Sequence, residues 1–107
     1  MSKSPTQVAR EREELRRQYG LLFDACVREF YRADPVHLAP HAPLDEYEPQ
    51  VGTVLPRLRE CAGQADVRHV LHEEFARWFC PELAGSLGRY STLSYTVWAL
   101  YQRASNT

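Results

Sequence analysis

Long apolar runs, a strong charge of one sign and paired cysteines are all missing from this sequence of 107 residues. No apolar stretch reaches the ~18 residues that a membrane-spanning helix needs, so we expect no membrane association. The first residues, M-S-K-S-P-T-Q-V, lack the apolar segment of a signal peptide. The net charge of −1 gives no overall basic field, so nucleic-acid binding is not expected. The three cysteines are odd in number and lack C-x-x-C spacing, which favours reduced thiols in the cytoplasm.

Lysine is scarce as well, because Lys3 is the single lysine among 13 basic residues. We interpret the excess of arginine as the codon bias of a GC-rich bacterial genome. The alternative is that the arginines recognise carboxylate or phosphate groups. Charge is unevenly placed along the chain. Residues 34–60 carry five acidic and two basic side chains, whereas residues 1–33 carry five acidic and seven basic ones. The middle of the chain is therefore its acidic part.

Apolar residues recur with the helical period in four segments. In residues 6–31 one stripe contains Val8, Leu15, Tyr19, Leu22, Phe23, Cys26 and Phe30. Other stripes fall in residues 44–61, 65–79 and 86–104, with Ser86 as the expected N-cap of the last helix. Pro56 predicts a kink in the helix expected over residues 44–61, and Gly52 leaves room for the proline ring there. Residues 32–43 hold three prolines and predict a loop.

These patterns predict an all-α fold without strands. We expect a compact single-domain bundle of about four amphipathic helices over residues 1–107, with the proline-rich loop at about 32–43 and residues 1–5 disordered. A chain this short can bury one hydrophobic core but leaves little material for a deep substrate cavity.

The stretch L-D-E-Y-E-P-Q-V-G places three carboxylates around one tyrosine at the expected start of the second helix. Asp45, Glu46 and Glu48 there would interact favourably with the helix dipole, by ~0.3–1 kcal/mol each. Tyr47 falls on the apolar stripe. The stretch therefore predicts a helix N-terminus with a buried tyrosine, while an interaction surface or a metal or catalytic site remain alternatives.

Histidine and cysteine offer weaker candidates for chemistry. His69 and Glu73 have the i,i+4 spacing of a chelating pair, but they lie on the face expected to be solvated. The order H-x-x-H-E also differs from the H-E-x-x-H of metalloprotease helices. Cys26 and Cys61 fall on apolar stripes, where a free cysteine behaves as a small hydrophobe. No cofactor is expected.

Glu74 is a more informative residue, because it lies on the apolar stripe with Val67, Leu71 and Trp78. A buried carboxylate needs a partner, since isolated burial of a charge costs several kcal/mol. We expect a buried polar clamp that ties this helix to the proline loop or to a tyrosine of the last helix. The alternative is a general acid or base in a cleft.

Three segments in order, D-P-V-H-L, D-E-Y-E-P-Q-V-G-T-V-L-P-R-L and H-E-E-F-A-R-W-F, resemble a widespread family of small bacterial proteins without an established activity. That family has a W-D-P-[IL]-G-L turn followed by D-E-Y-D. The resemblance covers roughly residues 15–103 and implies a small helical domain. The residues it implicates are Asp34, Pro35, Asp45, Glu46 and Tyr47.

This chain departs from the family pattern at two positions of the turn. Ala33 replaces the tryptophan, and His37 replaces the glycine. The second change bears on any turn geometry that needs glycine. The resemblance favours an arrangement in which Asp34 and the D-E-Y turn lie together and hold the loop onto the second helix.

The sequence predicts a non-enzymatic protein-interaction module. Its acidic 34–48 segment would be presented to an unknown, basic protein partner, as in an immunity-type or antitoxin-type inhibitor. The candidate residues are Asp34, Pro35, His37, Asp45, Glu46 and Tyr47, with Glu74 as the clamp. The alternative is a small enzyme or metal-binding protein that uses Glu74 with Asp45, Glu46 and nearby histidines. The oligomeric state does not follow from the pattern.

Overall fold

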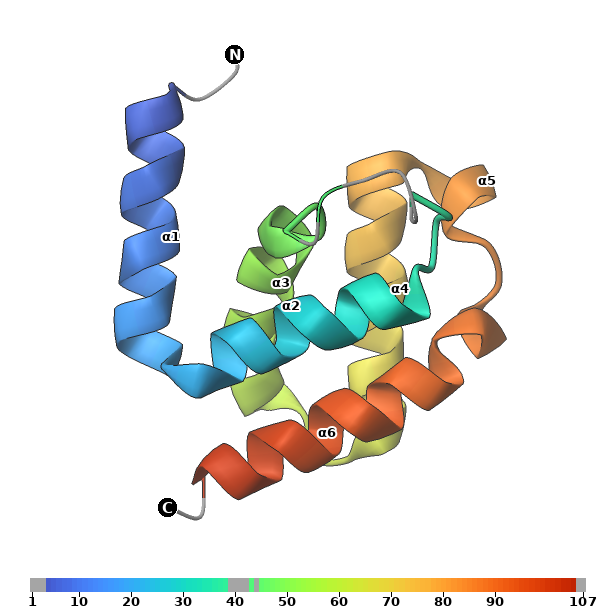
Figure 1. Cartoon of the computed structure of the whole chain (residues 1–107). Coiled ribbons are helices and arrows are strands. Elements are labelled where there is room, and N and C mark those ends of the chain that lie inside the picture. Colours follow the sequence, from blue (N-terminus) through green and yellow to red (C-terminus); the bar gives the residue numbers. More distant parts are fainter. Residues whose placement is uncertain (1–3, 39–42, 44, 106–107) are drawn as a thin grey trace.

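The computed structural model describes residues 4–38, 43 and 45–105 and confirms the all-α class (Figure 1). Six α-helices and two 3₁₀ segments replace the four long helices expected, and no strand occurs in this part of the chain. Their bounds are α1 Pro5–Tyr19, α2 Leu21–Ala33, α3 Glu48–Val54, η1 Leu55–Glu60, α4 Gln64–Phe79, α5 Pro81–Ala84, η2 Leu87–Tyr90 and α6 Ser91–Ser105. None of these helices has the length and apolar character required to cross a bilayer.

The first long helix predicted, over residues 6–31, is divided at Gly20 into α1 and α2. Gly20 has φ 59° and ψ −133°, a conformation that is strained for residues with a Cβ. The chain therefore turns between two helices that share one apolar stripe in the sequence. At the other end of α1, Ser4 accepts a hydrogen bond from the Gln7 amide as N-cap, and Pro5 begins the helix. We expected residues 1–5 to be disordered, but Ser4 and Pro5 form the ordered start of α1, and residues 1–3 lie outside the described residues.

The second and last helices also differ from the prediction at their ends. α3 begins at Glu48, and the chain tightens into the 3₁₀ segment η1 at Leu55, next to the predicted kink at Pro56. The segment between the predicted helices 65–79 and 86–104 contains the short helix α5. Ser86 makes no side-chain cap hydrogen bond, and α6 proper begins only at Ser91 after η2. Local turns at prolines and glycines thus subdivide the longer periodic segments.

The hydrophobic core lies around α4, which packs against α3, α5 and α6, while α2 runs beside α6 (Figure 1). Phe75 of α4 is fully buried at its centre. Its ring lies 5.4–5.8 Å, centroid to centroid, from four other rings. These belong to Phe30 of α2, Tyr47, Phe79 of α4 and Tyr90 of η2. This one side chain therefore joins α4 to α2, to η2 and to the turn before α3.

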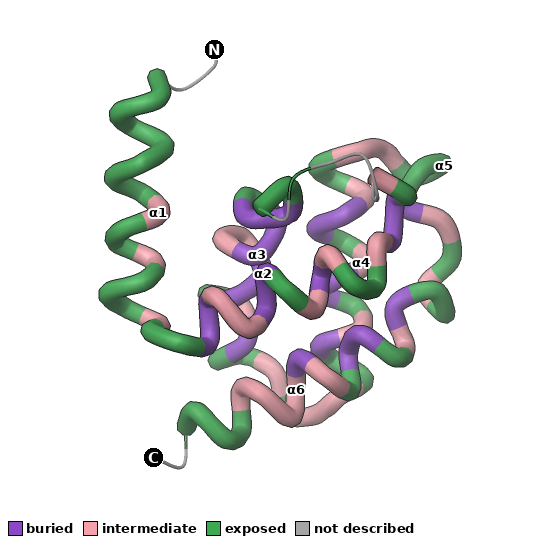
Figure 2. Tube along the Cα trace, in the orientation of Figure 1, coloured by how far each residue is buried: buried purple, intermediate pink, exposed green. Residues whose placement is uncertain are grey.

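Helix α1 stands at the edge of this core and has no buried residue of its own (Figures 1 and 2). Val8, expected on the buried stripe, is 40% exposed, and Leu15 and Tyr19 are only partly buried. Trp78 of α4 was also expected to be buried but is 45% exposed, with its indole Nε1 donating to Thr53 Oγ1 at 3.0 Å. The outer part of α1 is thus supported mainly by its own helical hydrogen bonds.

We predict that Phe75→Ala destabilises the protein by about 3–5 kcal/mol, because it removes a buried ring and leaves a cavity that its neighbours cannot fill. Urea denaturation followed by circular dichroism measures the loss. Trp78→Ala in the same helix is the matched control and should lose clearly less. Equal losses for the two variants would contradict the central role of Phe75.

Candidate functional site

The end of α2 is held by Asp34, which is its C-cap in the left-handed conformation, with φ 48° and ψ 58°. The backbone amide of Asp34 donates to Phe30 O at 2.9 Å. The side-chain Oδ1 accepts two further hydrogen bonds, from the Leu38 amide and from Tyr47 Oη, both at 2.7 Å. Asparagine and aspartate are, after glycine, the residues best suited to this conformation. Asp34 therefore both ends the helix and shapes the loop after it.

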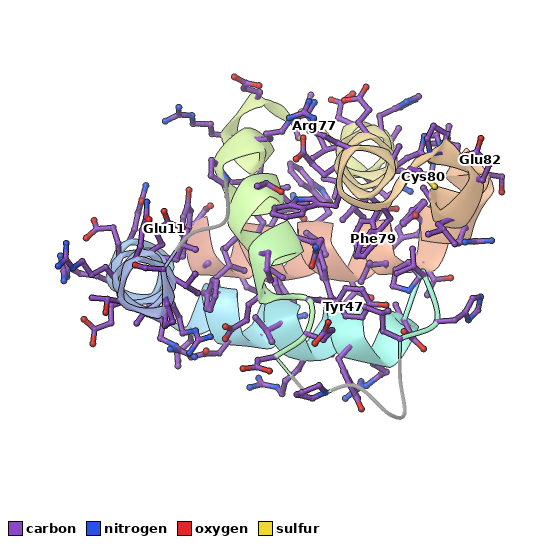
Figure 3. All side chains as sticks on the ribbon, turned by 90° about the horizontal axis from the view of Figure 1, so that it is seen from above. Glu11, Tyr47, Arg77, Phe79, Cys80 and Glu82 are labelled. Carbon is purple, nitrogen blue, oxygen red and sulfur yellow. The ribbon has the colours of Figure 1, made fainter. Side chains whose placement is uncertain are left out.

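Tyr47 directly precedes α3, and its side chain is fully buried in the core (Figure 3). Burial and the hydrogen bond to Asp34 raise the pKa of its hydroxyl above the usual value. The phenol therefore stays protonated and serves as a hydrogen-bond donor. Asp34 and the D-E-Y turn do lie together, as the resemblance led us to expect, and Tyr47 joins them.

The loop around this hydrogen bond is folded inward as well. Pro35 and Val36 are buried, and the Arg89 guanidinium donates from Nη1 to Pro35 O at 2.9 Å and to Leu83 O at 2.8 Å. His37 is exposed and has φ 60°, the left-handed conformation that glycine adopts without strain. Histidine therefore adopts at this position a backbone conformation that is more usual for glycine. Residues 39–42 of the proline-rich loop, and residue 44 after it, lie outside the described residues.

Glu48 belongs to the acidic 34–48 segment that we expected to face a partner, but it is directed toward α1. Only 11% of its side chain is exposed, and Arg12 Nε lies 2.6 Å from its Oε1. Arg16 Nη2 approaches Oε2 of the same carboxylate at 3.5 Å and also pairs through Nε with Asp24 Oδ1 at 3.2 Å. The Arg16 guanidinium lies 5.5 Å from the centre of the Phe23 ring. The two arginines of α1 thus neutralise the carboxylate at the start of α3.

The exposed part of the predicted acidic surface is consequently narrower than residues 34–48. Asp45 is 52% exposed at its side chain and meets Arg12 Nη2 only at 3.8 Å. Glu46 is exposed beside it. We call Asp45 and Glu46 the acidic rim. Asp34 and Glu48 belong to the same segment of sequence but point into the protein, so they are not free to meet a partner's charges.

Glu74 is 1% exposed and forms a clamp, although not with the elements expected. Its Oε2 accepts from Arg57 Nη1 of η1 at 2.8 Å and lies 3.4 Å from Arg77 Nη1. Arg57 also donates from Nη2 to Glu73 Oε1 at 2.6 Å, and this hydrogen bond lowers the pKa of Glu73. The clamp therefore ties α4 to η1 instead of the proline loop or a tyrosine of α6.

The candidates for metal or acid–base chemistry are separated in the fold. Glu74 pairs with arginines of η1 and α4, whereas Asp45 pairs with α1. His69 is exposed on α4, and His72 Nε2 forms a hydrogen bond with Gly85 O at 2.9 Å. Among residues 4–38, 43 and 45–105, no group of three or more His, Cys, Asp or Glu side chains is arranged to hold a metal ion. The three cysteines are free thiols.

Sequence reasoning missed the arginines that complete these sites. Arg12 and Arg16 are spaced i,i+4 on α1, a pattern that places both guanidinium groups on one face. That spacing could have indicated that the two arginines share one acidic partner, which the structure shows to be Glu48. Arg57 carried no comparable signal, because its pairing with Glu74 depends on how η1 and α4 pack.

We predict that Tyr47→Phe lowers the free energy of unfolding by about 1.5–3 kcal/mol, the usual range for a hydrogen bond to a charged group. Asp34→Ala should lose more, because two donors lose their acceptor and alanine is strained at this φ. Asp34→Asn should lose least, since asparagine keeps an acceptor oxygen and tolerates the backbone. Chemical denaturation of the double variant Asp34→Ala/Tyr47→Phe completes the cycle. Strictly additive losses would disprove the coupling.

A second prediction concerns the clamp, for which Glu73 provides an internal control with the same arginine partner. Glu74→Gln should cost about 1–3 kcal/mol, because it weakens a buried, charge-assisted hydrogen bond. Glu73→Gln should lower the free energy of unfolding by at most about 1 kcal/mol. This difference from the wild type should disappear at high salt, because salt screens the exposed ion pair. Unfolding free energies at low and high ionic strength test both. Indistinguishable variants would remove Glu74 from its structural role.

Comparison of the chain with known protein families, with curated proteins and with solved structures finds no match. The resemblance carried by Asp34, Pro35 and the D-E-Y turn therefore stays a prediction.

Proposed function

We propose that this protein is a non-enzymatic protein-interaction module of the bacterial cytoplasm. Its acidic rim, Asp45 and Glu46, binds an arginine-bearing segment of a basic protein partner. An inhibitor of the immunity or antitoxin type is the most concrete form of this function, because exposed carboxylates suit the basic active sites of many toxins.

The observation that carries the proposal is that Glu48, next to the acidic rim, already binds two arginines of α1. Glu48 takes two guanidinium groups, from Arg12 and Arg16, at the end of a turn whose other carboxylates remain exposed. Arg12 extends to Asp45 at 3.8 Å, so the rim borders directly on a site that accepts arginine. A partner arginine placed beside Arg12 would find Asp45 and Glu46 unoccupied on their solvent side.

The support beneath the rim favours recognition without a large rearrangement. Tyr47, between Glu46 and Glu48, is fixed by its hydrogen bond to Asp34 and by its ring contact with Phe75. A rim that is held in place loses less conformational entropy on binding than a mobile loop would. Electrostatic attraction at such a rim mainly raises the association rate and the selectivity for basic partners.

The direct test is affinity capture from a lysate of the native host, with the wild-type chain compared with Asp45→Lys/Glu46→Lys. We expect the wild type to retain a basic protein that the variant loses, because the variant places positive charge at the rim. The captured complex should also weaken at high salt, since the rim is exposed.

Glu60→Lys/Glu82→Lys is the matched control, because it changes two other exposed acidic residues by the same charge. This control should capture the partner as well as the wild type does. All three chains are first compared by circular dichroism and thermal unfolding. Equal capture by the wild type and by Asp45→Lys/Glu46→Lys would reject the proposal and leave Asp45 and Glu46 as a helix N-terminus only.

A further inference from the structure

The apolar stripe of residues 6–31 runs through Gly20 without a change of phase, although the backbone bends there. Leu15 and Tyr19 before the glycine fall on the same helical face as Leu22, Cys26 and Phe30 after it. A straight helix over residues 5–33 would therefore present one uninterrupted stripe. In the structure, this stripe is divided between α2, which is buried in the core, and α1, which has no buried residue. The sequence pattern is compatible with both the bent and the straight form.

In the bent form, four of the groups that α1 contacts form what we call the cradle: Phe23, Asp24, Glu48 and Gly52. Arg12 and Arg16 meet the carboxylates of the cradle, and Arg16 also lies over Phe23. Leu15 comes so close to Gly52 that a Cβ added there would lie 3.0 Å from Leu15 Cδ1. The cradle thus fits a helix that carries arginines at i and i+4 with a leucine just before the second.

We propose that two copies of this chain exchange their α1 helices. In the exchanged dimer Gly20 is helical, residues 5–33 form one straight helix, and each α1 lies in the cradle of the other copy. The occupant is a second copy because every group that fills the cradle belongs to this chain's own α1. Figure 1 shows α2 beginning at the edge of the molecule, so its straight extension leads away from its own core.

The exchange is possible at low cost because the contacts are the same in both forms. Each cradle receives two arginines and one leucine whether they come from its own chain or from the partner. The two forms then differ in the hinge and in the entropy of association. Glycine adopts the bent φ of 59° without strain, but it also gains less than other residues from becoming helical. Glycine at position 20 therefore favours the bent monomer over the exchanged dimer.

Replacing the hinge glycine tests the proposal directly. An alanine at position 20 meets no atom within 4 Å, so the variant is not hindered by packing, but it is strained at the bent φ and favours a helix. We expect Gly20→Ala to strengthen dimerisation by about a hundredfold or more, because two hinges straighten in each dimer and each contributes roughly tenfold. Analytical ultracentrifugation over a range of concentrations measures the constant.

Gly63→Ala is the matched control, because its φ of −176° is ordinary extended backbone and its added Cβ also meets no atom within 4 Å. It should leave the association of the wild type unchanged. If Gly20→Ala stays as monomeric as Gly63→Ala while both are folded by circular dichroism, the exchange is ruled out.

Charge-reversed chains give a second test that does not depend on the hinge. One chain carries Arg12→Glu/Arg16→Glu and the other carries Asp24→Arg/Glu48→Arg. Within either chain α1 is repelled by its own cradle, whereas in a mixed exchanged dimer both cradles are matched. Native mass spectrometry of the mixture should show a heterodimer in excess over both homodimers. Absence of the heterodimer, with both chains folded, counts against the exchange even if Gly20→Ala dimerises.

Discussion

The hydrogen bond from Tyr47 to Asp34 is the constraint on which the arrangement of this protein depends. It joins the residue that ends α2 to the residue that precedes α3, 13 positions further along the chain. The ring of Tyr47 also packs against Phe75 at the centre of the core. Because Tyr47 is directed inward, its neighbours Glu46 and Glu48 must point elsewhere, one to solvent and one to α1. The position of the whole acidic turn follows from this one side chain.

Arginine completes three of the polar sites in the described part of the fold. Arg12 and Arg16 serve Glu48, Arg57 serves Glu74, and Arg89 joins two carbonyl groups from separate segments. A guanidinium can address two acceptors at once in fixed directions, whereas a lysine ammonium is a single point charge on a flexible stem. The arginines at these positions thus have structural roles.

Much of the fold follows from helical periodicity, but its breaks do not. The stripe of α4 and the inward face of α2 were predictable because burial imposes the 3.6-residue period. The break at Gly20 was not, because the period continues across it, and the contacts that favour the bend join residues far apart in the sequence, such as Arg12 and Glu48. At the site, the burial of Tyr47 and the need of Glu74 for a partner could be inferred. The identity of Arg57 as that partner could not, since no local spacing links residues 57 and 74.

The acidic rim and the cradle are linked through Arg12, which lies 2.6 Å from Glu48 and 3.8 Å from Asp45. When one of two carboxylates that share a guanidinium is neutralised by another cation, the guanidinium is attracted mainly to the other carboxylate. A basic partner that neutralises Asp45 would leave Arg12 to Glu48 alone and so tighten α1 in the cradle. Such a coupling is reciprocal, because each binding event must change the free energy of the other by the same amount. Partner binding at the rim would then favour α1 held in a cradle over α1 released, whichever copy supplies it.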